Sequence, residues 1–194
     1  MSGPFKGVRV LELTSTVSGP FAGMMLADQG AEVIKIEPPG IGDLARFMGT
    51  IKDGMGAMFS TLNRNKKCIC LDFKNEEDLS VLMQLVSTAD VLIENYRPGI
   101  VRKLGIDYET LKKIKPDLIY CSISGYGQSG PYKEKKVYDP LIQGTVGIPH
   151  AQNSEFPELI RTIIYDKVTG LTSAQAISAA PVSYTHLTLP TKRI

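Results

Sequence analysis

The sequence lacks several features that would place it in a specialised class of protein. Its 22 Lys and Arg residues nearly balance its 20 Asp and Glu residues, so a formal charge of +2 gives no argument for nucleic-acid binding. No apolar run approaches the roughly 18 residues that a membrane span requires. The N-terminal segment also has no apolar stretch of the signal-peptide kind. We therefore expect a cytoplasmic protein with neither nucleic acid nor membrane as a partner.

Cysteine and histidine are also scarce, which limits metal and redox chemistry. The chain has three cysteines, Cys68, Cys70 and Cys121, and their pattern fits ordinary reduced thiols in a cytosolic protein. Its two histidines, His150 and His186, have no partner at the spacing of a metal site. We assign the histidines no role and predict no metal site.

The glycine-rich motifs that bind nucleotide phosphates are missing as well. Neither G-x-G-x-x-G nor G-x-x-x-x-G-K-[ST] occurs in the sequence. The segment SGYGQSG, at 124–130, carries its glycines at the wrong spacing and opens no obvious helix. A dinucleotide or P-loop site would therefore rest on an analogy of fold alone, which is a weak argument.

What the sequence does contain is an alternation of short β-branched runs with helical patterns. The expected strands lie at 7–13, 32–37, 67–73, 90–96, 117–127 and 159–166. The expected helices lie at 18–31, after Asn75, at 108–116 and from 169 onward, with Pro20 and Gly30 as start and stop signals of the first. This order predicts an α/β fold with a doubly wound, mostly parallel, Rossmann-like sheet. Ligands of such a sheet bind at the loops that follow the strands.

Several of these loops together resemble one family. The segments are GVRVLELTSTVSGPFAGMMLADQGAEVIKIEPPGIGD, LNRNKKCICLDFK, DVLIENYRPG, ISGYGQSGPY, VYDPLIQG and YDKVTGLTSAQAI. They are similar, in the same order, to segments of the family III CoA-transferases, which include the formyl-CoA:oxalate and L-carnitine CoA-transferases and have the α-methylacyl-CoA racemases as relatives. Each motif alone is short and forgiving, whereas six in order over residues 4–180 are specific. The resemblance implies an acyl-CoA:carboxylate CoA-transferase.

Asp166 matches the nucleophilic aspartate of that family. A carboxylate suits the task, because its attack on an acyl-CoA thioester gives a mixed anhydride that is itself activated. The released thiolate can then form an aspartyl-CoA thioester, and an incoming acid reverses the steps. The resemblance thus implies acyl-CoA as substrate, a carboxylic acid as acceptor, and no prosthetic group. The alternative from the residues alone is that Asp166 only caps the helix that begins near Thr169.

The pair Tyr138 and Asp139 separates two members of this superfamily. By resemblance, a tyrosine followed by an acidic residue lies beside the nucleophile in the transferases, whereas the racemases have a histidine base at the tyrosine position. Tyrosine, with a reference pKa near 10, is a poor general base at neutral pH, so the pair favours a transferase. The structural alternative is that Tyr138 is only a surface residue and Asp139 only the N-cap of a helix. A racemase or epimerase and a non-catalytic CoA-binding module remain the functional alternatives.

The resemblance also implies a set of CoA-contacting positions on the loops after the strands. These positions are Val17, Ser18, Leu71, Asp72, Phe73, Lys74, Asn95, Tyr96, Arg97, Lys103, Lys136 and Val137, with Tyr138 and Asp139 at the thiol end. Taken singly, Lys74 or Lys103 fits a solvated charge on a helix face equally well. Pro38 stands where some members carry an arginine, so one cationic contact to the nucleotide end is either absent or supplied by another residue.

The last residues do not continue the pattern that precedes them. Pro181 lacks the backbone donor that a continuing helix needs, and VSYTHLTLPTKRI then brings β-branched residues and a second proline. We predict a truncated N-terminal domain at 1–180 and a foreign tail at 181–194, with the junction near Ala180–Pro181. The alternative is that residues 181–194 are a natural variant terminus. The family's members are about twice as long and form interlocked homodimers, so we expect this chain alone to be inactive and poorly soluble.

Overall fold

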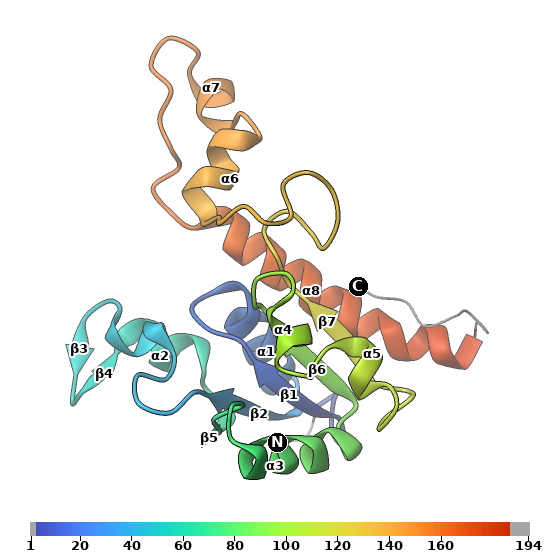
Figure 1. The fold of residues 1–194 in the computed structure, drawn as a ribbon. Helices are drawn as coiled ribbons and strands as arrows, with labels where there is room; N and C mark the ends of the chain where they lie inside the picture. Colours follow the sequence, from blue (N-terminus) through green and yellow to red (C-terminus); the bar gives the residue numbers. More distant parts are fainter. Residues whose placement is uncertain (1–2, 187–194) are drawn as a thin grey trace.

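A five-stranded parallel sheet forms the centre of the fold, and the computed structural model describes residues 3–186 of the chain (Figure 1). In sheet order the strands are β5 (Lys66–Cys70), β2 (Glu32–Glu37), β1 (Arg9–Leu13), β6 (Val91–Glu94) and β7 (Ile119–Ser122). Every pairing is parallel, and Leu11 of β1 lies opposite Ile34 on one side and Leu92 on the other. The predicted α/β class and parallel sheet are confirmed.

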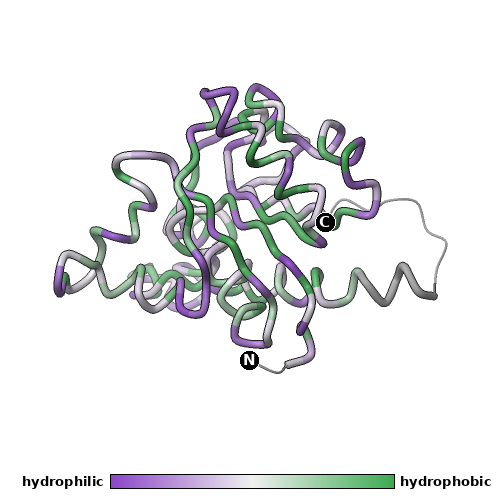
Figure 2. Tube along the Cα trace, turned by 90° about the horizontal axis from the view of Figure 1, so that it is seen from below, coloured by the Kyte–Doolittle hydropathy of each residue, from purple (hydrophilic) through white to green (hydrophobic). Residues whose placement is uncertain are grey.

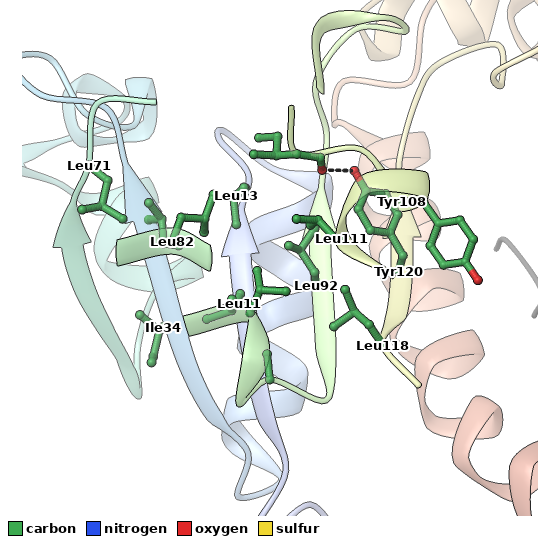
Figure 3. Close-up of a cluster of buried hydrophobic side chains, with 14 residues drawn as sticks. Leu11, Leu13, Ile34, Leu71, Leu82, Leu92, Tyr108, Leu111, Leu118 and Tyr120 are labelled. Carbon is green, nitrogen blue, oxygen red and sulfur yellow. Dashed lines mark hydrogen bonds between the residues drawn. The ribbon is translucent and has the colours of Figure 1, made fainter. Parts of the chain in front are cut away.

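Helices cover both faces of this sheet. On one face lie α1 (Ser18–Asp28) and α8 (Ile164–His186), and on the other lie α3 (Glu76–Ser87), α4 (Ile100–Lys103) and α5 (Tyr108–Leu111). Successive strand residues point to opposite faces. Leu11 and Leu92 therefore pack with Leu82 of α3 (Figure 3), whereas Val10 and Ile93 pack in the second hydrophobic cluster. The doubly wound arrangement follows from this alternation of apolar strand residues.

The local signals in the sequence mark helix ends as expected. Pro20 lies in the first turn of α1, where its missing N–H costs no hydrogen bond. Beyond α1, Gly30 has φ +100°, a left-handed conformation that glycine adopts without strain. The Asn75 side chain caps α3 by accepting from the N–H groups of Glu77 at 2.8 Å and Asp78 at 3.3 Å. Short-range chemistry is enough to fix these boundaries.

Two insertions extend beyond the sheet layers. The first comprises η1 (Leu44–Phe47), β3 (Ile51–Lys52), β4 (Met55–Gly56) and α2 (Ala57–Leu62). The second is an arm that contains α6 (Asp139–Thr145) and α7 (Ile148–Gln152) and projects away from the sheet (Figure 1). Figure 2 shows hydrophobic colouring concentrated along the central strands. The insertions nevertheless carry large exposed apolar side chains, among them Phe47 and Phe156.

The strand predicted at 159–166 is wrong. Residues 159–163 form no regular element, and α8 begins at Ile164. The Gln143 side chain donates to the carbonyls of Ile160 (3.3 Å) and Thr162 (3.1 Å) and accepts from the Ile160 N–H at 2.8 Å. A side chain of α6 thus satisfies backbone groups that a neighbouring strand would otherwise pair.

The expected helix break at Pro181 is also absent, because α8 extends to His186. A proline can bend an α-helix instead of ending it. Residues 187–194, which hold most of the predicted foreign tail, lie outside the described residues, so the division at 180–181 stays a prediction. Among the described helices, none combines the length and the hydropathy that crossing a bilayer would need.

Candidate functional site

A cavity of about 550 Å³ opens at the carboxyl ends of the strands. Its walls come from the loops after β1, β6 and β7 and from the first turns of α6 and α8. The chain leaves β1 toward β2 on one side, whereas β6 lies on the other side of β1. The loops after β1 and β6 therefore diverge, and such a switch point is where doubly wound folds bind ligands. The cavity lies at the end of the sheet that the sequence predicted.

Asp166 lines this cavity from the first turn of α8 and is half-buried. Within residues 3–186 its carboxylate forms no hydrogen bond or ion pair, so both oxygens are free to contact a ligand. The N-terminus of α8 places partial positive charge beside it, which favours the anionic form. The predicted nucleophile position thus combines access to the cavity with a free carboxylate.

The carboxylate of Asp139 supplies the cap of α8 from a different helix. Its Oδ2 accepts from the N–H groups of Tyr165 at 2.5 Å and Asp166 at 3.1 Å, and its Oδ1 accepts from Gln143 Nε2 at 2.6 Å. Asp139 is buried, with 4% of its surface exposed. The alternative in which Asp166 is only a helix cap is therefore wrong. Asp139 also does not cap its own helix, since the N-cap position of α6 is Tyr138.

Burial raises the pKa of Asp166, and the neighbouring charge of Asp139 raises it further. The sequence predicted a carboxyl group with an ordinary pKa, so its environment adds a feature that the residue type does not reveal. A carboxylate with a raised pKa is a stronger base once ionised. The charges of Asp166 and Asp139 repel each other when both are ionised, so the rest of the fold must keep the two carboxylates close together. Tyr138, next to this pair in the lining of the cavity, is 74% exposed.

The loop after β1 is fixed by the loop after β6. Asn95 accepts from the Ser15 N–H at 3.0 Å through its Oδ1 and donates to the Ser15 carbonyl at 2.9 Å through its Nδ2. The Asn95 amide therefore holds the wall of the cavity together. Val17 and Ser18, at the start of α1, line that same wall.

Cationic side chains dominate the wall formed by residues 124–138. Lys133, Lys135 and Lys136 line the cavity here, and Arg97 adds a fourth cation from the loop after β6. A Cβ at Gly125 would meet Val137 Cγ1 at 1.8 Å, so only glycine allows the loop to fold back this closely. Against these four cations the lining carries two carboxylates, Asp139 and Asp166. The wall is suited to an anionic ligand.

The structure brings most predicted site residues into this cavity. Those that line it are Val17, Ser18, Asn95, Tyr96, Arg97, Lys136, Val137, Tyr138, Asp139 and Asp166. Other lining residues were not predicted from the sequence, among them Thr16, Lys133, Lys135, Tyr165 and Thr169. The run KEKK directly before Val137 was a usable signal for the two lysines.

Five predicted CoA-contacting positions do not line the cavity: Leu71, Asp72, Phe73, Lys74 and Lys103. Leu71 and Phe73 belong to the hydrophobic cluster on the α3 face. The Asp72 N–H donates to Asp78 Oδ2 at 2.7 Å. Lys74 and Lys103 are exposed. Their contact with a ligand stays a prediction.

Comparison with known proteins identifies the family. The sequence model of CoA-transferase family III matches residues 5–185. The chain belongs to CoA-transferase family III. Acetyl-CoA:oxalate CoA-transferase of Acetobacter aceti is 46% identical over 156 residues, which cover 80% of this chain and 40% of that protein. Succinyl-CoA:glutarate CoA-transferase of Mus musculus is 41% identical over 179 residues, which cover 91% of this chain and 41% of that protein.

The fold agrees with this assignment to CoA-transferase family III. The crystal structure of a CAIB/BAIF family protein from Brucella suis is 41% identical and superposes with a TM-score of 0.89. The alignment covers 95% of this chain and 50% of that one. The chain therefore spans half or less of the length of these three relatives.

Proposed function

We propose that this chain is the N-terminal part of an acyl-CoA:carboxylate CoA-transferase in which Asp166 is the nucleophile. The observation that carries the proposal is the free carboxylate of Asp166 in a cavity lined by four cationic side chains. Relatives named for oxalate and glutarate CoA-transfer support this reaction class. CoA enters as acyl-CoA, a substrate, and an organic carboxylate is the acceptor.

The reaction begins when an Asp166 oxygen attacks the thioester carbonyl, breaks the C–S bond and releases CoA thiolate. The resulting mixed anhydride is attacked by that thiolate at the Asp166 acyl carbon, which frees the donor acid and leaves an aspartyl-CoA thioester. The acceptor carboxylate then displaces CoA to form a second anhydride. Thiolate attack on the acceptor's acyl carbon gives the new acyl-CoA and restores Asp166. Every step exchanges one acyl bond for another, so no oxidant or net proton is needed.

The other residues of the cavity have binding and positioning roles in this scheme. Lys133, Lys135, Lys136 and Arg97 supply the positive charge that the phosphates of CoA require. Asp139 orients the first turn of α8 and keeps the backbone of Asp166 in place. Asn95 acts on the ligand indirectly, because its side-chain amide hydrogen-bonds both the N–H and the carbonyl of Ser15 in the cavity wall.

Asp166→Asn tests the proposal in the intact protein that carries this segment. Removing the nucleophile should lower kcat by at least about a thousandfold, because an amide cannot form the anhydride. Hydroxylamine should trap a modified Asp166 in the wild type after addition of acyl-CoA, and mass spectrometry locates it. Asp117→Asn is the control, since Asp117 is exposed near β7. Normal turnover by the Asp166→Asn protein rules the mechanism out.

A racemase is the second candidate, and Tyr138 is the residue that distinguishes it. A racemase would exchange the α-proton of an acyl-CoA with solvent deuterium and need no acceptor acid. The exposed phenol of Tyr138 is a weak base for that step. Deuterium incorporation without an acceptor would favour the racemase. CoA binding without transfer between any donor and acceptor would instead favour a non-catalytic module.

A further inference from the structure

Four charged side chains lie fully buried beneath the loop after β1. They are Glu12 of β1, Lys35 of β2, Lys66 of β5 and Asp43, the residue before η1. Lys35 Nζ lies 3.1 Å from Glu12 Oε1 and 2.9 Å from Asp43 Oδ2, and Lys66 Nζ lies 2.7 Å from Glu12 Oε2. Two basic and two acidic side chains thus pair where no water reaches them. We call these four residues the buried quartet.

Burial and pairing act in opposite directions on the two lysines of the buried quartet. For Lys66 burial outweighs the charge of Glu12, and its pKa is lowered. Burial by itself lowers the pKa of Lys35, but the charges of Glu12 and Asp43 outweigh it, so the pKa is raised and Lys35 stays an ammonium. The packing is specific as well. A Cβ at Gly23 of α1 would meet Glu12 Oε2 at 1.9 Å, so α1 can cover the quartet only with glycine at that position.

The buried quartet is bonded to the loop that forms one wall of the cavity. Lys35 Nζ donates to the Thr14 carbonyl at 2.8 Å, and Asp43 Oδ1 accepts from the Thr16 N–H at 2.8 Å. Thr16 has φ +71°, a left-handed conformation that is a genuine outlier for a β-branched residue. Such strain persists only where the surroundings impose it, and it concentrates at ligand-binding segments.

Stability alone is a weak explanation for this arrangement. Replacing a buried ion pair with well-packed apolar side chains is often neutral or stabilising, so ion pairs of this kind need a further reason. Here the reason is geometric, because Asp43 connects the quartet to the strained Thr16 peptide of the cavity wall. Asp43 itself does not line the cavity. It can act on a ligand only through neighbours that do: Thr16, whose N–H it accepts, and Leu44, which follows it in the chain. The Thr16→Gly background separates these two routes.

We propose that Asp43, fixed by Lys35, is a positioning residue that holds the strained Thr16 peptide and so presets the wall Thr16–Val17–Ser18 for acyl-CoA. This proposal rests on the proposed function, since it names acyl-CoA as the ligand. Without Asp43 the Thr16 peptide relaxes toward negative φ, and only part of the molecules present the binding-competent wall. The apparent affinity for acyl-CoA is then the full affinity multiplied by the fraction of molecules that present this wall.

The test measures KM and kcat in the intact protein for Asp43→Ala, Thr16→Gly and the double variant. Asp43→Ala should raise KM for acyl-CoA about tenfold and change kcat by less than about threefold. Glycine adopts positive φ without strain. The effect of Asp43→Ala on KM should therefore shrink below about threefold when residue 16 is glycine. An equal effect in both backgrounds overturns the proposal.

Asp90→Ala is the matched control, because Asp90 accepts from the Arg9 N–H at 2.8 Å at the opposite end of the sheet. It should leave KM unchanged. If Asp43→Ala gives no soluble protein, Asp43→Asn replaces it. The Asp43→Asn side chain keeps an acceptor for the Thr16 N–H but loses the charge that faces Lys35, so the KM should rise in the same direction by a smaller factor.

Hydrogen exchange of the Thr16 amide separates this inference from the proposed function. In Asp43→Ala the Thr16 N–H should exchange at least about tenfold faster than in the wild type, whereas Asp90→Ala should leave it unchanged. An unchanged exchange rate overturns the positioning role even where CoA transfer is intact. If the wild type transfers no CoA, the proposed function fails, and the exchange rate still decides whether Asp43 holds Thr16.

Discussion

At the scale of single residues, the environment of Asp166 differs from what its residue type suggests. An aspartate on an exposed loop is ionised well below neutral pH. Here burial and the charge of Asp139 both favour the protonated form and raise the pKa. The same two causes make the ionised carboxylate a better nucleophile, so the site combines reactivity with a cost in stability. That cost gives a pH dependence with a defined sign.

Asp166→Asn should change how the free energy of unfolding varies with pH. Because the pKa of Asp166 is raised in the folded state, the folded protein binds this proton more tightly than the unfolded chain. Its stabilising contribution is complete below the ordinary value of 3.8 and is lost as the pH rises through the folded pKa. The wild type should therefore lose stability relative to Asp166→Asn over that range. Urea unfolding of both intact proteins at a series of pH values measures this difference in the free energy of unfolding.

Asp117→Asn provides a control of opposite sign. Its hydrogen bond with Lys115 lowers the pKa of Asp117, so its small contribution is present above pH 3.8 and is lost as the pH falls. A difference between wild type and Asp166→Asn that grows in favour of the wild type with rising pH contradicts the raised pKa of Asp166.

At the scale of elements, the junction of α6 and α8 depends on side chains that replace backbone pairing. Gln143 and Asp139 together bond backbone groups of Ile160, Thr162, Tyr165 and Asp166. The sequence of this segment favours a strand by its β-branched residues, yet no strand of the described chain pairs with it. Contacts between distant segments thus overrode the local preference. The candidate nucleophile consequently lies on a helix.

Gln143→Leu should destabilise the intact protein by about 1–3 kcal/mol, because it leaves the Ile160 N–H and carbonyl without partners. The Thr162 carbonyl keeps the Ile164 N–H as a partner at 3.1 Å. Gln152→Leu is the matched control. Gln152 donates to one carbonyl, that of Glu158, on the exposed arm, and its loss should cost less than about 0.5 kcal/mol. Denaturant unfolding compares the two. Equal effects would show that Gln143 carries no special role at the junction.

At the scale of the whole molecule, the exposed apolar side chains bear on the prediction that this chain is incomplete. Ile41, Phe47 and Phe156 are each at least 60% exposed. Phe47 and Phe156 lie on the two insertions outside the sheet layers, and Ile41 lies in the segment that leads into the first. We interpret these side chains as contacts for another segment or chain of the longer protein. We propose that they are covered in the intact, longer protein, which forms an interlocked homodimer.

Expression of the 194-residue chain alone should give a poorly soluble product without CoA-transfer activity. The intact protein should be soluble, dimeric and active, because its further residues and its second copy cover the insertions. Light scattering and a CoA-exchange assay on both proteins measure this. A stable, active monomer of 194 residues would contradict the proposal.

The sequence by itself determined the five strands of the central sheet, the apolar alternation that builds the doubly wound arrangement, and the caps at Asn75 and Gly30. These features depend on residues close in sequence, or on the two-residue period of a strand. It also carried the family resemblance that singled out Asp166. Only the tertiary structure decided that Asp166 lies in a helix capped by Asp139, and that Asp43 holds Thr16. Those contacts join residues that are 27 positions apart in each case, and no local pattern specifies such a pairing.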